Sequence, residues 1–117
     1  MRVLLVDDNE LWRASLVRAL GDRGATVAVE AGSPQELDAR LGGIELADID
    51  VAVLDLRLPP TWSDEGIHLA RRLRHAAPAI AIIILSGYEQ DVQLYYATRA
   101  LEDLEAGGGI GYLTKDR

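Results

Sequence analysis

One stretch of the chain decides its fold: Val51-Ala52-Val53-Leu54-Asp55-Leu56-Arg57-Leu58-Pro59-Pro60. Four apolar residues run directly into one carboxylate, and a proline pair that cannot continue regular structure follows soon after. A short apolar run that ends at such a breaker indicates a fully buried strand of a parallel sheet. Asp55 would then lie at the carboxyl end of this strand, where open α/β sheets bind their ligands.

The amino terminus has the same design. Met1-Arg2-Val3-Leu4-Leu5-Val6-Asp7-Asp8 is an apolar run that ends in a pair of acids. A single aspartate after a strand is more often a loop residue or a helix cap, and Asp7-Asp8 also suits simple capping. Two strands that deliver three carboxylates to one edge of a sheet nevertheless predict a binding site.

Strand and helix patterns alternate along the rest of the chain. Strands are expected at residues 2–6, 25–31, 50–55, 80–85 and 110–114. The first helix is predicted from the stripe Trp12, Leu16, Ala19 and Leu20, with Gly21 and Gly24 ending it. A later helix is expected over residues 89–106, before three glycines. This alternation predicts a doubly wound five-stranded parallel sheet with right-handed crossovers.

Local signals mark where the helices begin and end. Asn9 or Asp8 can cap the first helix, and Ser33-Pro34-Gln35-Glu36 has the pattern of a capping box with proline at the first helical position. Asp64 and Glu65 complement the dipole at the start of the third helix. Its buried stripe is Leu69, Ala70, Leu73 and Ala77, and Pro78 ends it.

Composition limits the class of protein. The chain has 117 residues, a length that suits one domain over residues 1–117 with its own core. A net charge of −7 argues against direct binding of nucleic acid or an anionic membrane. The lack of cysteine excludes a disulfide scaffold and a thiol nucleophile, and two histidines do not suggest a histidine-rich metal site. With no apolar run of spanning length and no signal peptide, a cytoplasmic protein without membrane contact is expected.

The carboxyl edge of such a sheet would collect Asp7, Asp8, Asp55, Ser86 and Lys115. Three neighbouring carboxylates repel one another unless a cation neutralises them, and oxygen ligands alone favour a hard ion such as Mg²⁺. A lysine and a hydroxyl beside them can bind an anion, so the set predicts phosphoryl chemistry with an aspartate nucleophile. Taken singly, Ser86 suits a turn and Lys115 a solvated cation.

Nucleotide binding is not predicted. The turn after the first strand reads Asp-Asp-Asn-Glu and has no glycine-rich phosphate loop. The glycines at 107–109 precede a strand, which is the wrong context for a phosphate cradle.

At these residues the chain resembles the receiver domain of two-component response regulators, which have a flavodoxin-like fold. The matching motifs are Val-Leu-Leu-Val-Asp7-Asp8-Asn-Glu, Val-Ala-Val-Leu-Asp55-Leu-Arg-Leu-Pro, Ile-Ile-Leu-Ser86-Gly and Gly-Tyr112-Leu-Thr-Lys115. The resemblance implies that Asp55 is the phosphoacceptor for a sensor histidine kinase. It also implies that Asp8, Asp55 and the backbone carbonyl of Arg57 coordinate Mg²⁺ directly, while Asp7 acts on the ion largely through water.

The resemblance further implies that Lys115 and Ser86 contact the phosphoryl group and that Tyr112 changes rotamer as Ser86 moves. Tyr112 also suits an ordinary core aromatic. Asp116 stands where many receivers have a proline. Lys115-Asp116, together with the proline pair before Asp64-Glu65-Gly66, looks most like the NarL/LuxR-type transcriptional regulators.

That likeness implies output through a C-terminal DNA-binding domain outside this chain and allows for a homodimer. The final helix of a receiver fold is missing after residue 114, so we expect that the chain is cut before it or that another chain covers that face. The expected role is a switch rather than an enzyme, apart from its own phosphotransfer and dephosphorylation.

Two other functions suit the same residues. A degenerate receiver could act as a docking module that is never phosphorylated. A Mg²⁺-dependent phosphohydrolase with an aspartate nucleophile is less favoured, because Asp7 and Asp8 are adjacent whereas haloacid dehalogenase-like enzymes have an aspartate two residues after the nucleophile.

Overall fold

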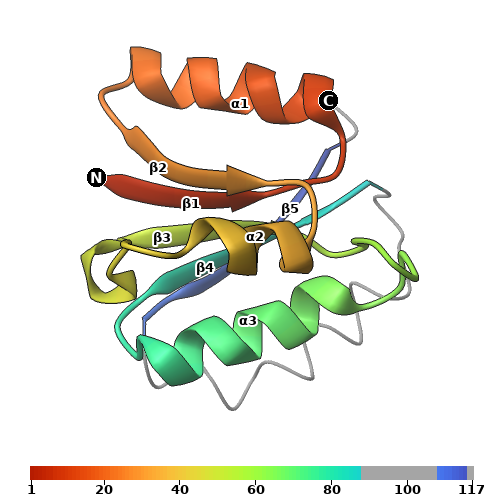
Figure 1. Cartoon of the computed structure of the whole chain (residues 1–117). Coiled ribbons are helices and arrows are strands. Elements are labelled where there is room, and N and C mark those ends of the chain that lie inside the picture. Colours follow the sequence, from red (N-terminus) through yellow and green to blue (C-terminus); the bar gives the residue numbers. More distant parts are fainter. Residues whose placement is uncertain (88–107, 116–117) are drawn as a thin grey trace.

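The computed structural model describes residues 1–87 and 108–115 (Figure 1). Its strands are β1 (Arg2–Val6), β2 (Thr26–Ala31), β3 (Val51–Asp55), β4 (Ala81–Ser86) and β5 (Ile110–Thr114). Its helices are α1 (Glu10–Asp22), α2 (Pro34–Arg40), the short 3-10 helix η1 (Leu46–Asp48) and α3 (Glu65–Ala76). The helix expected over residues 89–106 lies outside the described residues. No helix among the described residues is both long and apolar enough to cross a bilayer.

The five strands form one parallel sheet in the order β2-β1-β3-β4-β5. The chain first moves from β1 outward to β2 and later from β3 outward to β4, so the direction of winding reverses between the neighbours β1 and β3. Open α/β sheets bind ligands outside the carboxyl ends of the strands at such a reversal. The predicted doubly wound sheet is confirmed, and its reversal lies between the strands that end in Val6 and Asp55.

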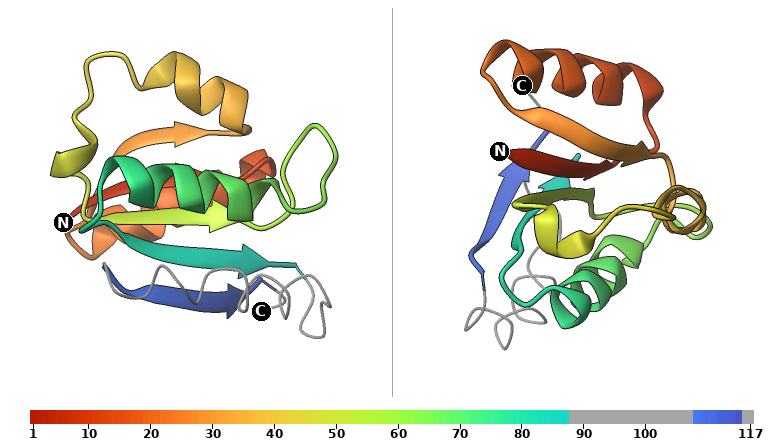
Figure 2. Two further views of the ribbon diagram at one scale, coloured as in Figure 1. Left: turned by 90° about the horizontal axis from the view of Figure 1, so that it is seen from below. Right: turned by 60° about the vertical axis from the view of Figure 1, so that its left-hand side comes forward.

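Helices cover both faces of the sheet (Figures 1 and 2). The larger core cluster joins one face, including Leu4, Leu54 and Ile84, to α2 and α3. The smaller cluster, built on Val3, Leu5, Val53 and Leu85, packs on the other face against α1. Because strand side chains alternate between faces, the odd-numbered residues of β1, β3 and β4 face α1.

Helix α1 departs from the predicted stripe. Leu16 and Leu20 pack against the sheet as expected, but Ala19 is exposed and Val17 takes part in the packing. The helix also continues through Gly21 to Asp22, so Gly21 does not end it. The turn follows at Gly24, where φ is +87° and glycine avoids the steric cost of a left-handed backbone. Strands β2, β3 and β4 each begin one residue later than predicted.

The predicted N-cap bonds of Asn9 and Ser33 are present. The side chain of Asn9 accepts a hydrogen bond from the Trp12 backbone N–H at 2.9 Å, and Ser33 Oγ accepts one from Glu36 N–H at 3.0 Å. Pro34 is the first residue of α2, as expected. Glu36 also pairs with Arg40 one turn later at 2.9 Å. The side chains of Asn9 and Ser33 thus accept hydrogen bonds from backbone amides that the start of a helix leaves without partners.

Gly66 sets the approach of α3 to the end of β3. A Cβ atom at this position would lie 2.2 Å from the carbonyl oxygen of Asp55 and 2.8 Å from Leu56 Cα. The Gly66 backbone N–H instead donates to the Leu56 carbonyl at 2.9 Å. Only glycine allows the first turn of α3 to lie this close to the backbone beside Asp55.

Gly66→Ala should lower the free energy of unfolding by about 1–3 kcal/mol, because backbone atoms cannot move aside as a flexible side chain can. Gly21→Ala is the matched control, since nothing lies within 4 Å of its added Cβ. That variant should raise the stability by up to about 1 kcal/mol, because alanine favours a helix. Urea denaturation measures both, and equal stabilities of the Gly66 variant and the wild type would contradict the close approach.

Candidate functional site

Three carboxylates meet at the carboxyl ends of β1 and β3. Asp7 and Asp8 follow β1, and Asp55 is the last residue of β3. One carboxylate oxygen from each lies within 4.8 Å of the other two. Asp7 and Asp55 are buried, with exposed fractions of 0% and 7%, whereas Asp8 is open to solvent. The three aspartates predicted to lie together are therefore adjacent.

Lys115 balances part of this charge. Its Nζ atom donates to Asp7 Oδ2 at 2.8 Å and to Asp55 Oδ2 at 3.3 Å. The ammonium group also lies 5.5 Å from the centroid of the Trp12 ring, within the range of a cation–π interaction. Lys115 comes directly after β5, and its backbone N–H donates to the Ser86 carbonyl at 2.7 Å. The sheet thus brings the last part of the chain to the first two acids.

Burial and neighbouring charges shift the titration of this group. Removal from water raises the pKa of Asp55 to about 6; Lys115 opposes this shift, and Asp7 and Asp8 add to it. Burial disfavours the Lys115 ammonium, but its hydrogen bond to Asp7 and the charges of Asp55 and Asp7 outweigh that effect and raise its pKa. At neutral pH the site therefore holds ionised Asp55 and charged Lys115.

Asn9 and Arg13 both help to hold Asp7 at the end of β1. The Asn9 backbone N–H donates to Asp7 Oδ1 at 2.9 Å. Arg13 on α1 donates through Nη1 to the Asp7 carbonyl at 2.5 Å and through Nε to Glu30 on β2 at 3.0 Å. Arg13 therefore joins the ends of β1 and β2 to α1, and the Asn9 N–H and Lys115 each hold one oxygen of the Asp7 carboxylate.

The remaining predicted residues lie around this group. Ser86 is buried at the end of β4 and is in register with Thr114. Tyr112 is in register with Ile84 and packs against the larger core cluster. By strand alternation, Ser86 and Tyr112 lie on the α3 side of the sheet as diagonal neighbours. Arg57 is half-buried and lies two residues beyond Asp55.

Sequence reasoning missed three residues of the site. Arg13 and Trp62 contact the acidic pair from other elements, and Trp12, which was expected only in the packing stripe, lies beside Lys115. Each contact joins residues of different elements, so helical or strand periodicity in the sequence does not predict it. Trp12 and Arg13 both lie in the first turn of α1, but only the fold shows that this end of the helix reaches the strand ends.

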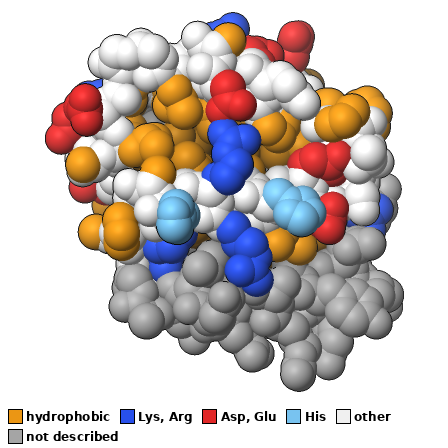
Figure 3. Space-filling view, turned by 60° about the horizontal axis from the view of Figure 1, so that its bottom comes forward, with side chains coloured by type: hydrophobic (Ala, Val, Ile, Leu, Met, Phe, Trp, Pro, Cys, Tyr) orange, Lys and Arg blue, Asp and Glu red, His pale blue; other side chains and the backbone are white. Residues whose placement is uncertain are grey.

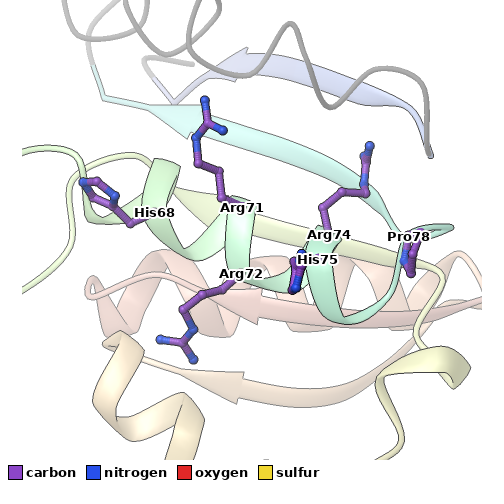
Figure 4. A pocket seen from close by; sticks show the side chains of 6 residues that line it. All are labelled: His68, Arg71, Arg72, Arg74, His75 and Pro78. Carbon is purple, nitrogen blue, oxygen red and sulfur yellow. The ribbon is translucent and has the colours of Figure 1, made fainter.

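A basic surface lies away from the site, over α3 (Figure 3). It surrounds a hollow of about 610 Å³ lined by His68, Arg71, Arg72, Arg74, His75 and Pro78 (Figure 4). Several of these groups already have partners: His68 lies 3.3 Å from Asp64, Arg72 pairs with Asp38, and Arg74 donates to the Ile80 carbonyl at 3.0 Å. None of the predicted site residues lines this hollow.

Comparisons with known proteins identify the family. The model of the response regulator receiver domain matches residues 3–116. The chain belongs to this family. DevR/DosR of Mycobacterium tuberculosis, a DNA-binding transcriptional activator, is 40% identical over 117 residues, which cover 99% of this chain and 48% of that protein. NarL of the same organism, a probable transcriptional regulatory protein, is 29% identical and is covered to 48%.

Solved structures agree with this assignment. A response regulator from Burkholderia pseudomallei, with a phosphorylated aspartic acid, a calcium ion and citrate, has a TM-score of 0.72 at 27% identity, covering 99% of this chain and 60% of that one. A LuxR-family response regulator from Aurantimonas has a TM-score of 0.72 at 28% identity, covering 98% and 74%. The predicted receiver fold and the likeness to NarL/LuxR-type regulators are confirmed. This receiver chain spans about half the length of the curated relatives named above.

The chemistry of the receiver site suits a divalent cation. Its ligand atoms are carboxylate oxygens, the hard donors that Mg²⁺ and Ca²⁺ prefer. The raised pKa of Asp55 shows that one cationic side chain does not fully offset burial and the charge of the other two acids. An added cation would complete this charge balance.

Asp55→Asn should stabilise the metal-free receiver at neutral pH. The folded chain keeps the Asp55 proton up to about pH 6, whereas the unfolded chain loses it near 3.8, so the wild type loses stability as the pH rises through this window. The substitution should therefore raise the free energy of unfolding at pH 7.5 by roughly 2–3 kcal/mol, and the gain should vanish near pH 4.

Urea denaturation in a chelator across this pH range measures the effect. Asp22→Asn, at the exposed end of α1, is the control and should stay within about 0.5 kcal/mol of the wild type. A gain in the Asp55 variant that did not depend on pH would contradict the role of burial in raising the pKa.

Proposed function

We propose that the chain is a phosphorylation-dependent switch in which Asp55 accepts a phosphoryl group from the phosphohistidine of a sensor kinase. The observation that carries this proposal is the meeting of Asp7, Asp8, Asp55 and Lys115 at the reversal point of the sheet. Receivers are signalling domains of two-component systems, and the DevR/DosR relative is named a DNA-binding transcriptional activator.

The proposed metal ion is Mg²⁺, with Asp8, Asp55 and the backbone carbonyl of Arg57 as direct ligands and Asp7 acting largely through water. Bound there, Mg²⁺ would offset negative charge on the transferring phosphoryl group. Asp7 and Asp8 belong to one strand end and Asp55 to its neighbour, so the strand pairing sets the spacing of the carboxylates before any ion binds. Oxygen donors without sulfur or imidazole favour a hard ion.

In the proposed transfer, an oxygen of the ionised Asp55 carboxylate attacks phosphorus as the bond from phosphorus to the kinase histidine nitrogen breaks. The departing nitrogen keeps the electron pair, so Asp55 needs no base to remove a proton when it is already ionised. Its pKa of about 6 leaves most of it ionised at pH 7. Lys115, whose ammonium group donates a hydrogen bond to Asp55, would pair with the oxygens of the added phosphoryl group.

The conformational response would run through β4 and β5. Ser86 would donate its hydroxyl to a phosphoryl oxygen, and Tyr112 would change rotamer in the space that this movement opens. The two residues share one side of adjacent strands, and the backbone of Lys115 is bonded to that of Ser86. A local change in charge would thereby bias a two-state surface. We further propose that the output is transcriptional, through a DNA-binding domain joined to this receiver.

Incubation with acetyl phosphate and intact-mass measurement tests the phosphoacceptor. Wild type should gain one phosphoryl group when Mg²⁺ is present, and Asp55→Asn should gain none, because the amide is not a nucleophile. Asp22→Asn should be labelled like the wild type. Labelling that persists in the Asp55 variant would reject Asp55, and a wild type that is never labelled would favour an unphosphorylated docking module.

Lys115→Ala should separate phosphorylation from its response. The variant should still bind Mg²⁺, since the ammonium group competes with a cation for the same carboxylates. It should lose the change in near-ultraviolet circular dichroism that follows phosphorylation of the wild type. Arg18→Ala, which removes an exposed cation on α1, should keep that change. An unaltered response in the Lys115 variant would count against its role.

A further inference from the structure

Trp62 lies in the loop between β3 and α3 and contacts the acidic site. Its indole Nε1–H donates a hydrogen bond to Asp8 Oδ2 at 2.9 Å, across 54 positions of sequence. The side chain is 53% exposed, so burial of the ring is not what holds it there. Asp8 is itself exposed and would otherwise rotate freely in water. The contact therefore joins the loop after Asp55 to the outermost carboxylate of the site.

The loop holds Trp62 from both sides. The Glu65 carboxylate accepts hydrogen bonds from Thr61 N–H at 2.8 Å, from the Thr61 hydroxyl, and from Ser63 N–H at 3.0 Å. The Trp62 backbone N–H donates to the Leu58 carbonyl at 2.9 Å. Desolvation opposes ionisation of Glu65, but the bonds from Thr61 and Ser63 outweigh it and lower its pKa to about 2. The anion thus organises the residues on either side of Trp62.

The backbone of Trp62 has an unusual conformation. Its φ is +50°, in the left-handed region that a bulky residue rarely adopts outside a constrained turn. Such a conformation costs on the order of 1–3 kcal/mol and persists only where surrounding contacts impose it. Glycine would suit the turn better, so the tryptophan side chain at this position points to a role for the indole group.

We propose that Trp62 is a positioning residue of the metal site, whose indole N–H orients the Asp8 carboxylate for a divalent cation. This inference rests on the proposed function of the site. The bond engages Oδ2 and leaves Oδ1 of Asp8 available as a ligand. Hydrogen bonds to a metal-binding carboxylate fix its rotamer and reduce the conformational freedom that binding must remove.

The same bond ties the metal site to the loop that follows Asp55. That loop contains Arg57, whose carbonyl is a proposed ligand, and it ends in the Thr61–Glu65 hydrogen bonds. A hollow of about 420 Å³ opens between Asp8 and Trp62 toward Gly32 and Ser33. Trp62 therefore lines the solvent-facing side of the site, next to the exposed carboxylate of Asp8.

Calorimetric titration with Mg²⁺ tests the role of the indole N–H. Trp62→Phe keeps an aromatic ring and removes the donor, and it should weaken Mg²⁺ binding by about 10-fold, the lower end of the effect expected for a group that supports a metal ligand. Leu11→Ala is the control, because Leu11 is an exposed apolar residue on α1, with 79% exposure. Its Mg²⁺ affinity should match the wild type.

A second measurement does not depend on the fold of the variant. The chain has two tryptophans, so the ¹⁵N-labelled wild type gives two indole N–H signals, and Trp12→Phe identifies the one from Trp62. Addition of Mg²⁺ should shift the Trp62 signal in the wild type. Wild-type affinity in Trp62→Phe, or a Trp62 signal unmoved by bound Mg²⁺, would overturn the inference. A wild type that binds no Mg²⁺ would overturn the metal site as well.

Discussion

This receiver depends on one constraint: two buried carboxylates share a single half-buried cation. Asp7 and Asp55 lie out of water on neighbouring strands, and the Lys115 ammonium bonds to both. Removal of the Lys115 ammonium would leave two buried carboxylates without compensation, which is far more costly than loss of an exposed ion pair. The surrounding structure serves this requirement: Arg13 holds the Asp7 backbone, and Gly66 lets α3 approach the backbone of Asp55.

The alternation of side chains along the strands separates two parts of the site. Asp7, Asp55 and Lys115 continue the rows that face α1, whereas Ser86 and Tyr112 continue the rows that face α3. The charged groups therefore lie on the α1 side of the sheet edge. The two residues proposed to respond to phosphorylation lie on the α3 side. The Lys115 backbone, bonded to the Ser86 carbonyl, connects them at the point where β4 and β5 end.

The chain carries a net charge of −7, yet its charge is unevenly distributed. Acids gather at the carboxyl ends of β1 and β3, whereas arginines and histidines gather over α3 (Figure 3). Most of the basic groups pair with an acid or with the backbone, as Arg72 does with Asp38 and Arg74 with Ile80. The acids of the site have only Lys115 within the described residues as an ion-pair partner, which leaves them suited to a cation.

Sequence by itself determined the features that depend on near neighbours along the chain and on the periodic spacing of apolar residues. Apolar runs that end in acids predicted the parallel strands and the meeting of Asp7, Asp8 and Asp55, because parallel strands place their carboxyl ends at one edge. Ser33 and Pro34 predicted the start of α2 because capping involves only near neighbours. The joint pattern also indicated that Lys115 belongs to the site.

Only the tertiary structure decided the contacts between distant segments. The predicted stripe on α1 included Ala19, but in the fold Val17 packs against the sheet and Ala19 is exposed. The helix also continues through Gly21, which was expected to end it. Arg13 and Trp62 carry no local signal of a role at Asp7 and Asp8. Their contacts exist because the order β2-β1-β3 brings α1 and the loop after β3 to the same strand ends.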